Sequence, residues 1–131
     1  MKIDHIGYAV RRIERAIESF QKLGFTFGKE IIEDTDRNVK ISFGEKDGYK
    51  IELVSPLDKS LESPVDQYLG NAHGTPYHIC YCSDNFDNEV EELKKQGFKV
   101  VIEPKKATAF DGKNVIFLMS LGFGLMEIVE A

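Results

Sequence analysis

Two segments of the chain alternate between large apolar side chains and small or polar ones with a period of two. In residues 5–10, one face carries a histidine, a glycine and an alanine, and the other carries isoleucine, tyrosine and valine. Residues 78–82 repeat this arrangement, with His78 in the place of His5. The alternation predicts two strands, each with one face for a core and one face of small residues beside a histidine.

A helical pattern follows each of these strands. Apolar side chains recur every three or four residues in residues 13–23 and again in residues 86–93, which is the stripe that a helix presents to a sheet. Gly24 and Gly97 follow the two patterns, each 19 residues after its histidine. Glycine readily adopts the left-handed conformation at a helix end, so both helices are predicted to stop there.

Three further strands are predicted in each half from short apolar or β-branched runs. We place them at residues 29–33, 38–43 and 49–55 in the first half and at residues 100–103, 114–120 and 125–129 in the second. Turns at residues 44–48 and 121–124 precede the last strand of each half. Between the halves, Ser63-Pro64 predicts the start of a short helix that ends near Leu69.

The two halves are therefore an internal repeat. Residues 3–30 laid over residues 76–103 share eight identities in 28 positions, among them both histidines and both helix-ending glycines. The sequence predicts an α+β fold in which two pseudo-symmetric βαβββ modules form one curved mixed sheet with a metal-binding cup. We expect a single domain over residues 1–131, with module one at about 1–55, a linker at 56–75 and module two at about 76–131.

Four side chains stand at equivalent places in the repeat and have metal-ligand character. His5 and His78 lie early in the first strand of each module, and Glu52 and Glu127 lie in the last. A carboxylate between large apolar neighbours is costly to bury without a cation or several donors. Two imidazoles and two carboxylates suit a divalent first-row metal, and their summed charge of −2 would cancel that of the ion. We expect all four to be metal ligands.

Composition and charge narrow the function classes. The chain is 42% hydrophobic and 30% charged, which excludes a disordered tail and a fibre. The uncharged stretch at residues 114–126 is shorter than a membrane span. Net charge is −5 and no run of lysine or arginine exceeds two, so nucleic-acid binding is not expected.

The two cysteines and the third histidine receive simpler interpretations. Cys80 and Cys82 lie two apart on one predicted strand face, where a disulfide would be strained, so we expect reduced thiols and a cytoplasmic location. The first residues show no charged-then-apolar leader. A zinc–thiolate site at the cysteines would leave both glutamates unused. His73 has no partner in the repeat and is interpreted as solvated.

Four segments resemble the signature segments of the vicinal oxygen chelate superfamily, which includes glyoxalases, methylmalonyl-CoA epimerases, extradiol dioxygenases and the fosfomycin and bleomycin resistance proteins. They are DHIGYAV (residues 4–10), IEL (51–53), YHI (77–79) and MEI (126–128). The resemblance covers essentially the whole chain. It implies paired βαβββ modules that form a metal cup chelating two adjacent substrate oxygens.

Within the superfamily the sequence is most similar to the methylmalonyl-CoA epimerase branch. The segments SPV (63–65), PYHI (76–79) and DGKNVIFL (111–118) carry this likeness. Some members place an acidic base in the strand after the first helix, at a position that aligns with Lys40. The branch implies an acyl-CoA-like substrate, whose anionic tail Lys105, Lys106 and Lys113 could meet, and a homodimer.

The resemblance therefore implies a metal-dependent isomerase with one zinc, cobalt, nickel or manganese ion. Glu52 and Glu127 would act as catalytic bases on opposite faces of an enolate, which gives epimerisation. A glyoxalase (lactoylglutathione lyase) acting on a hemithioacetal would use the same four ligands. An extradiol dioxygenase would need only His5, His78 and Glu127, so Glu52 argues against it. A drug-sequestering resistance protein commonly lacks the ligands.

Overall fold

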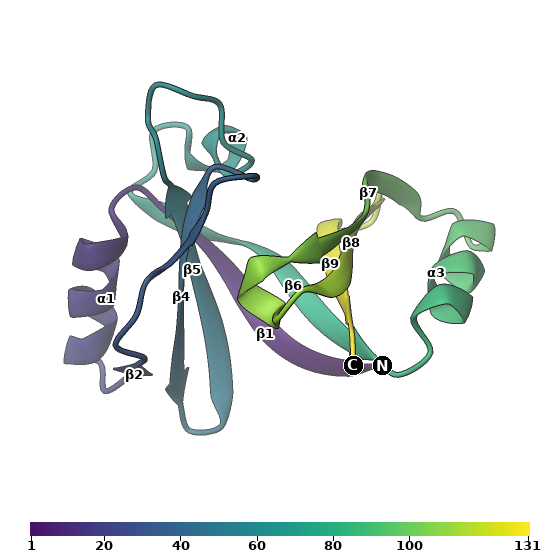
Figure 1. The fold of residues 1–131 in the computed structure, drawn as a ribbon, viewed down its shortest axis with the longest axis horizontal. Helices are drawn as coiled ribbons and strands as arrows, with labels where there is room; N and C mark the ends of the chain where they lie inside the picture. Colours follow the sequence, from purple (N-terminus) through teal and green to yellow (C-terminus); the bar gives the residue numbers. More distant parts are fainter. The chain divides into compact units, whose positions relative to one another are not determined.

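A computed structural model describes residues 1–131, apart from the side chain of Thr108. Strands and short helices follow one another along the chain (Figure 1). In order they are β1 (Lys2–Val10), α1 (Ile13–Lys22), β2 (Thr26–Phe27), β3 (Ile32–Asp34), β4 (Val39–Lys46), β5 (Tyr49–Pro56), α2 (Asp66–Leu69), β6 (Gly74–Ser83), α3 (Phe86–Lys95), β7 (Lys99–Ala107), the 3-10 helix η1 (Thr108–Phe110), β8 (Lys113–Ser120) and β9 (Gly124–Glu130).

The chain divides into two compact units. The amino-terminal unit comprises His5–Tyr77, and the carboxy-terminal unit comprises Met1–Asp4 together with His78–Ala131. Residues 1–4 thus belong to the second unit, where the amino group of Met1 lies 3.4 Å from a carboxylate oxygen of Glu89. The linker at residues 56–75 belongs to the amino-terminal unit. That the whole chain acts as one domain stays a prediction.

Asn38 and Arg11 hold the linker on the amino-terminal unit. The Asn38 amide donates to the carbonyl oxygens of Asp58 and Glu62, both at 3.0 Å, and accepts from the Asp58 N–H at 2.9 Å. The Arg11 Nε donates to the Ala72 carbonyl at 2.7 Å. These bonds satisfy backbone groups that a free linker would leave to water, which explains why residues 56–75 pack as part of this unit.

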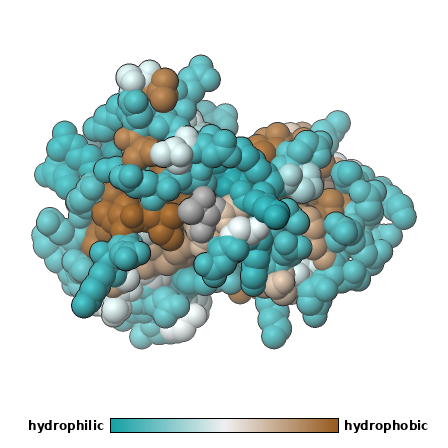
Figure 2. Space-filling view, in the orientation of Figure 1, coloured by the Kyte–Doolittle hydropathy of each residue, from teal (hydrophilic) through white to brown (hydrophobic). Residues whose placement is uncertain are grey.

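The amino-terminal unit is a mixed sheet covered by one helix. β1 pairs with β5 in parallel, β5 pairs antiparallel with β4, and β2 and β3 both pair with β4. The apolar side of α1 packs with residues of β1 and β5 in a core that includes Val10, Ile13 and Leu53. Figure 2 shows hydrophobic side chains, in brown, gathered over the strands beside α1.

The carboxy-terminal unit repeats this pattern. β6 pairs with β9 in parallel, and β9, β8 and β7 follow as antiparallel neighbours. Its main core joins Phe86 and Val90 of α3 to Ile116, Leu118 and Ile128 of the sheet. The predicted fold class, α+β with two βαβββ modules and mixed strand pairing, is confirmed by this topology.

The helix ends confirm the predicted glycine stops. Gly24 and Gly97 have φ of 98° and 97°, a backbone conformation that only glycine adopts without strain. In each case the N–H of the following phenylalanine donates back to a carbonyl of the last helical turn, at 3.1 Å for Phe25 and 3.0 Å for Phe98. The chain therefore reverses toward the sheet at the same point in both modules.

Several predicted boundaries are wrong. Of the strand expected at residues 29–33 only the end is found, as β3, while β2 lies before it and residues 28–31 do not pair with β4. The strand expected at residues 100–103 is longer, since β7 continues to Ala107. β4 continues to Lys46, so the first hairpin turn is only Asp47 and Gly48. The linker helix ends at Leu69 as predicted but begins at Asp66.

None of the helices in the described residues has the length and apolar character needed to span a membrane.

Gly44 gives a test of the packing under α1. A Cβ at Gly44 would lie 2.5 Å from ring carbons of Phe27, whereas a Cβ at Gly28 would meet nothing within 4 Å. Gly44→Ala should lower the free energy of unfolding by about 1–3 kcal/mol, because Phe27 must move out of a packed position. Gly28→Ala is the matched control and should change it by less than about 0.5 kcal/mol. Urea denaturation measures both, and equal stability of the two variants would contradict this packing.

Candidate functional site

His5 and Glu52 form a buried pair within the amino-terminal unit. The Nε2 atom of His5 lies 3.4 Å from Oε1 of Glu52. His5 is 1% exposed and Glu52 is 3% exposed. The parallel pairing of β1 with β5 sets Gly7 opposite Glu52, and His5 shares the face of Gly7 because side chains alternate along a strand. Register and alternation together bring the imidazole and the carboxylate side by side.

His78 and Glu127 repeat this arrangement within the carboxy-terminal unit. Nε2 of His78 lies 3.7 Å from Oε1 of Glu127, and both residues are 4% exposed. β6 and β9 pair in parallel with Cys80 opposite Glu127, as Gly7 is opposite Glu52 in the other unit. The predicted equivalence of the two histidine–glutamate pairs therefore holds at the level of strand register.

A phenylalanine contacts the histidine of each pair. Phe43 of β4 pairs with Glu52 and presents its ring edge-on to His5 at 5.6 Å between centroids. Phe117 of β8 pairs with Glu127 and does the same to His78 at 5.5 Å. Such contacts fix the orientation of an imidazole. The sequence analysis missed both residues, although each precedes its glutamate by almost the same interval, nine and ten residues.

The donor set of each pair fits a divalent metal ion. With metal–ligand distances of about 2.1 Å, two ligands of a tetrahedral ion lie about 3.4 Å apart. The distances of 3.4 and 3.7 Å between imidazole nitrogen and carboxylate oxygen match this spacing. Imidazole and carboxylate are common ligands of first-row metals, and an ion offsets the cost of burying the carboxylate. Each pair therefore offers one nitrogen and one oxygen donor at the spacing of two ligands of a divalent ion.

The two cysteines lie on the face of the His78–Glu127 pair. Cys80 is fully buried and packs with Ala107, Val115 and Val129, while Cys82 is partly buried beside them. Neither cysteine forms a disulfide, as predicted. Their apolar packing suits structural thiols better than metal ligands.

The three lysines expected to meet the anionic tail of a substrate lie on two different faces of the sheet, as the strand register shows. Lys105 pairs with Val115, and Ala107 pairs with Lys113. Val115 and Ala107 pack with Cys80, and paired residues share a face, so Lys105 and Lys113 lie on the face of the His78–Glu127 pair. Lys106 lies on the opposite face. Only two of the three predicted lysines therefore flank this side of the sheet.

Lys40 lies on the helix side of the amino-terminal sheet. It pairs with Ser55, three residues from Glu52 along β5, so its side chain points to the face opposite the glutamate. Its Nζ lies 3.4 Å from a carboxylate oxygen of Glu14 in α1. A base at this position would face the helix, which leaves Glu52 and Glu127 as the buried carboxylates of the two pairs.

Tyr68 and Tyr77 stack at the end of the linker. Their ring centroids lie 5.0 Å apart within the amino-terminal unit. Burial raises the pKa of the Tyr68 phenol, because a buried phenolate loses its hydration. The Tyr68 phenol therefore stays neutral at physiological pH.

Comparison with known proteins gives a consistent assignment. Residues 4–117 match a family model described as the glyoxalase/bleomycin resistance protein/dioxygenase superfamily. Three of the four predicted ligand residues fall inside this match, and Glu127 lies beyond it. The human mitochondrial methylmalonyl-CoA epimerase is 30% identical over 99% of this chain and 74% of its own length.

Two solved structures extend the likeness to the fold. A hypothetical protein from Bacillus halodurans is 28% identical and aligns with a TM-score of 0.84 over 99% of this chain and 94% of its own. The methylmalonyl-CoA epimerase of Mycobacterium tuberculosis is 25% identical, with a TM-score of 0.82 over 98% of this chain and 87% of its own. The fold described above is thus shared with an epimerase.

Proposed function

The chain belongs to the glyoxalase/bleomycin resistance protein/dioxygenase superfamily, and we propose that it is a divalent-metal-dependent epimerase of methylmalonyl-CoA or a closely related acyl-CoA. Its relatives make it an epimerase-like enzyme with a small-molecule substrate. The observation that carries the finer proposal is the pair of buried His–Glu arrangements at equivalent register, His5–Glu52 and His78–Glu127.

The proposed metal site combines both pairs of one chain. A single pair supplies two ligands, and a first-row divalent ion takes at least four. Joining His5 and Glu52 with His78 and Glu127 gives a four-ligand set with a charge of −2, which one divalent ion neutralises. The repeat supports this proposal, because duplication of a two-ligand module produces such a set. A homodimer with one complete site in each chain stays part of the proposal.

The proposed reaction moves the proton on the carbon between two carbonyl groups. When bound, the ion supplies Lewis-acid polarisation of a carbonyl, which acidifies the neighbouring C–H bond. Glu52 takes this proton from one face of the substrate and Glu127 returns one to the other face, or the reverse. Phe43 and Phe117, which contact the histidines, exclude water from the carboxylates. Exchange of the proton between faces inverts the carbon.

The metal proposal predicts one ion per chain. Elemental analysis of protein dialysed against zinc, cobalt, nickel or manganese should give a ratio near one, because both pairs serve one ion. Glu52→Gln and Glu127→Gln should each weaken metal binding at least tenfold, since an amide is a much poorer ligand than a carboxylate. The exposed Glu18→Gln on α1 is the control and should bind as the wild type does. Two ions per chain would contradict a shared site.

The proposed reaction predicts that the α-carbon of methylmalonyl-CoA exchanges its hydrogen in deuterated water. Mass spectrometry measures this exchange for each epimer separately. Metal-loaded wild-type protein should exchange both. At a metal concentration that saturates each variant, Glu52→Gln should slow exchange from one epimer and Glu127→Gln from the other, by at least about 100-fold, because each epimer presents its proton to a different base.

The same experiment distinguishes the proposed epimerase activity from a glyoxalase-type lyase activity. A metal-loaded wild type that exchanges neither epimer, but converts the hemithioacetal of methylglyoxal and glutathione, would assign glyoxalase activity instead. Variants that both slow the same epimer would show that one glutamate is the only base.

The placement of Lys105 and Lys106 on opposite faces of β7 predicts that their substitutions change the KM for the acyl-CoA differently. Lys105→Gln should raise the KM for the acyl-CoA several-fold and leave kcat nearly unchanged, because a charge that holds the substrate tail contributes equally to ground and transition states. Lys106→Gln removes the same charge from the opposite face of β7 and should leave KM unchanged. Equal effects of the two substitutions would remove Lys105 from the substrate site.

A further inference from the structure

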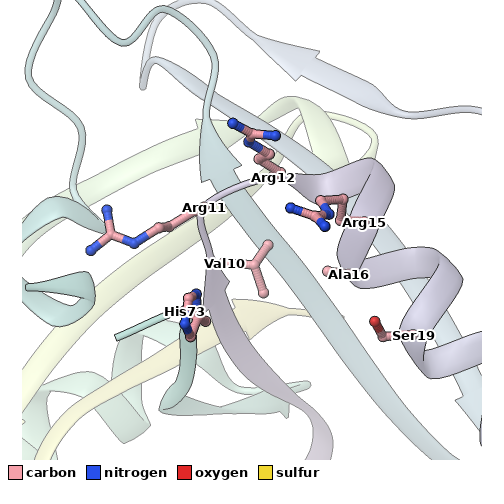
Figure 3. A pocket seen from close by; sticks show the side chains of 7 residues that line it. All are labelled: Val10, Arg11, Arg12, Arg15, Ala16, Ser19 and His73. Carbon is pink, nitrogen blue, oxygen red and sulfur yellow. The ribbon is translucent and has the colours of Figure 1, made fainter. Parts of the chain in front are cut away.

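Three of the four arginines in the sequence line one pocket of the amino-terminal unit. They are Arg11, Arg12 and Arg15, and His73 also lines the pocket (Figure 3). The pocket has a volume of about 550 Å³, within the range of small-molecule sites. In a chain of net charge −5, this concentration of guanidinium groups marks a surface that differs from the rest of the molecule.

The end of β1 and the start of α1 position these side chains. β1 ends at Val10 and α1 begins at Ile13, so the arginines follow the strand directly and continue into the first helical turn. Arg11 donates through Nε to the Ala72 carbonyl at 2.7 Å and through a terminal nitrogen to the Gly70 carbonyl. Arg11 thereby holds the loop that carries His73 against the pocket. Arg11 is a positioning residue, and Arg12 and Arg15 stay available.

No carboxylate neutralises Arg12 or Arg15 within the described part of the chain. The acidic residue of the same helical turn, Glu14, pairs instead with Lys40 at 3.4 Å. Backbone hydrogen bonding, together with Lys40, lowers the pKa of Glu14, so its charge is present but serves another partner. The amino end of a helix already carries a partial positive charge, so cations gathered there repel it and one another.

The second module shows that the fold does not require arginines here. At the repeat shift of 73, Asp84, Asn85 and Asn88 occupy the positions of the three arginines. The first turn of α3 contains two acidic residues, Asp87 and Glu89, which is the favourable arrangement at a helix start. The unfavourable charge at the start of α1 therefore needs a reason outside the folding of the module.

We propose that this pocket binds a phosphate-bearing small molecule, with the guanidinium groups of Arg12 and Arg15 on the phosphate oxygens and His73 as a further donor. A guanidinium presents a planar fork of N–H donors that matches phosphate geometry. A second pocket of about 390 Å³ shares Arg11 and Arg12 and adds Lys59, together with Asp66, whose carboxylate accepts from the Ser63 N–H at 2.8 Å. Two pockets joined at the same arginines suit a diphosphate, or a nucleotide carrying two phosphate groups.

The deciding experiment is a titration with pyrophosphate and with adenosine 3′,5′-diphosphate, followed by calorimetry at low salt. Wild-type protein should bind with a Kd below about 1 mM. The Arg12→Gln/Arg15→Gln double variant should bind at least tenfold more weakly, because it loses two charge-assisted contacts. Lys22→Gln, at the other end of α1, removes one positive charge from an exposed position and should bind as the wild type does.

Absence of binding to the wild type, or equal binding by the double variant, overturns the proposal. So does equal weakening by Lys22→Gln, since it would assign the effect to general charge. Circular dichroism and urea denaturation of the double variant verify that both substitutions leave the fold intact. The titration does not involve turnover, so its outcome is separate from that of the proposed epimerase activity.

Turnover kinetics decide whether the phosphate in the pocket belongs to an acyl-CoA substrate or to a separate ligand. If the pocket holds the nucleotide end of an acyl-CoA substrate, which rests on the proposed function, the double variant should raise KM about as much as it weakens adenosine 3′,5′-diphosphate binding. Adenosine 3′,5′-diphosphate should then compete with the substrate. An unchanged KM together with lost pyrophosphate binding assigns the pocket to a separate phosphorylated ligand.

Discussion

A buried carboxylate beside a buried imidazole is the constraint on which each half of this molecule depends. Removing a glutamate from water among apolar strands costs several kcal/mol unless a partner replaces the lost hydration. In each unit parallel pairing of the first and last strands sets an imidazole beside the carboxylate, His5 beside Glu52 and His78 beside Glu127. Parallel pairing of these strands needs a crossover connection, which here includes the helix, so the helix, the sheet order and the histidine–glutamate pair depend on one another.

The repeat made much of this predictable. Period-two alternation locates the strands that carry His5 and His78. The internal repeat distinguishes these two histidines from ordinary strand residues, because both stand at the same position of their module. Phe43 and Phe117 were missed because their contacts depend on the register of antiparallel neighbours, which hairpin length sets and alternation does not reveal. The side-chain bonds from Asn38 and Arg11 to backbone carbonyls, which hold the linker on the first unit, leave no periodic signal in the sequence.

The two modules keep their histidine–glutamate pairs and differ in what surrounds them. Opposite Glu52 stands Gly7, which leaves space, whereas opposite Glu127 stands Cys80, which fills it and joins an apolar cluster. Phe43 has the ammonium group of Lys50 over its ring at 5.5 Å. Under the proposed function, this divergence would let the two modules contact the two sides of one asymmetric substrate differently while the histidine–glutamate pairs stay the same.

The helices that follow the two histidine strands begin with opposite charge, three arginines in one module and acidic residues in the other. A negatively charged molecule is therefore attracted by the start of α1 and repelled by the start of α3 while it is still several ångströms from either surface. Long-range fields of this kind orient a ligand during diffusion, before any contact forms. The dependence of the association rate on ionic strength thus carries information about which module meets the ligand first.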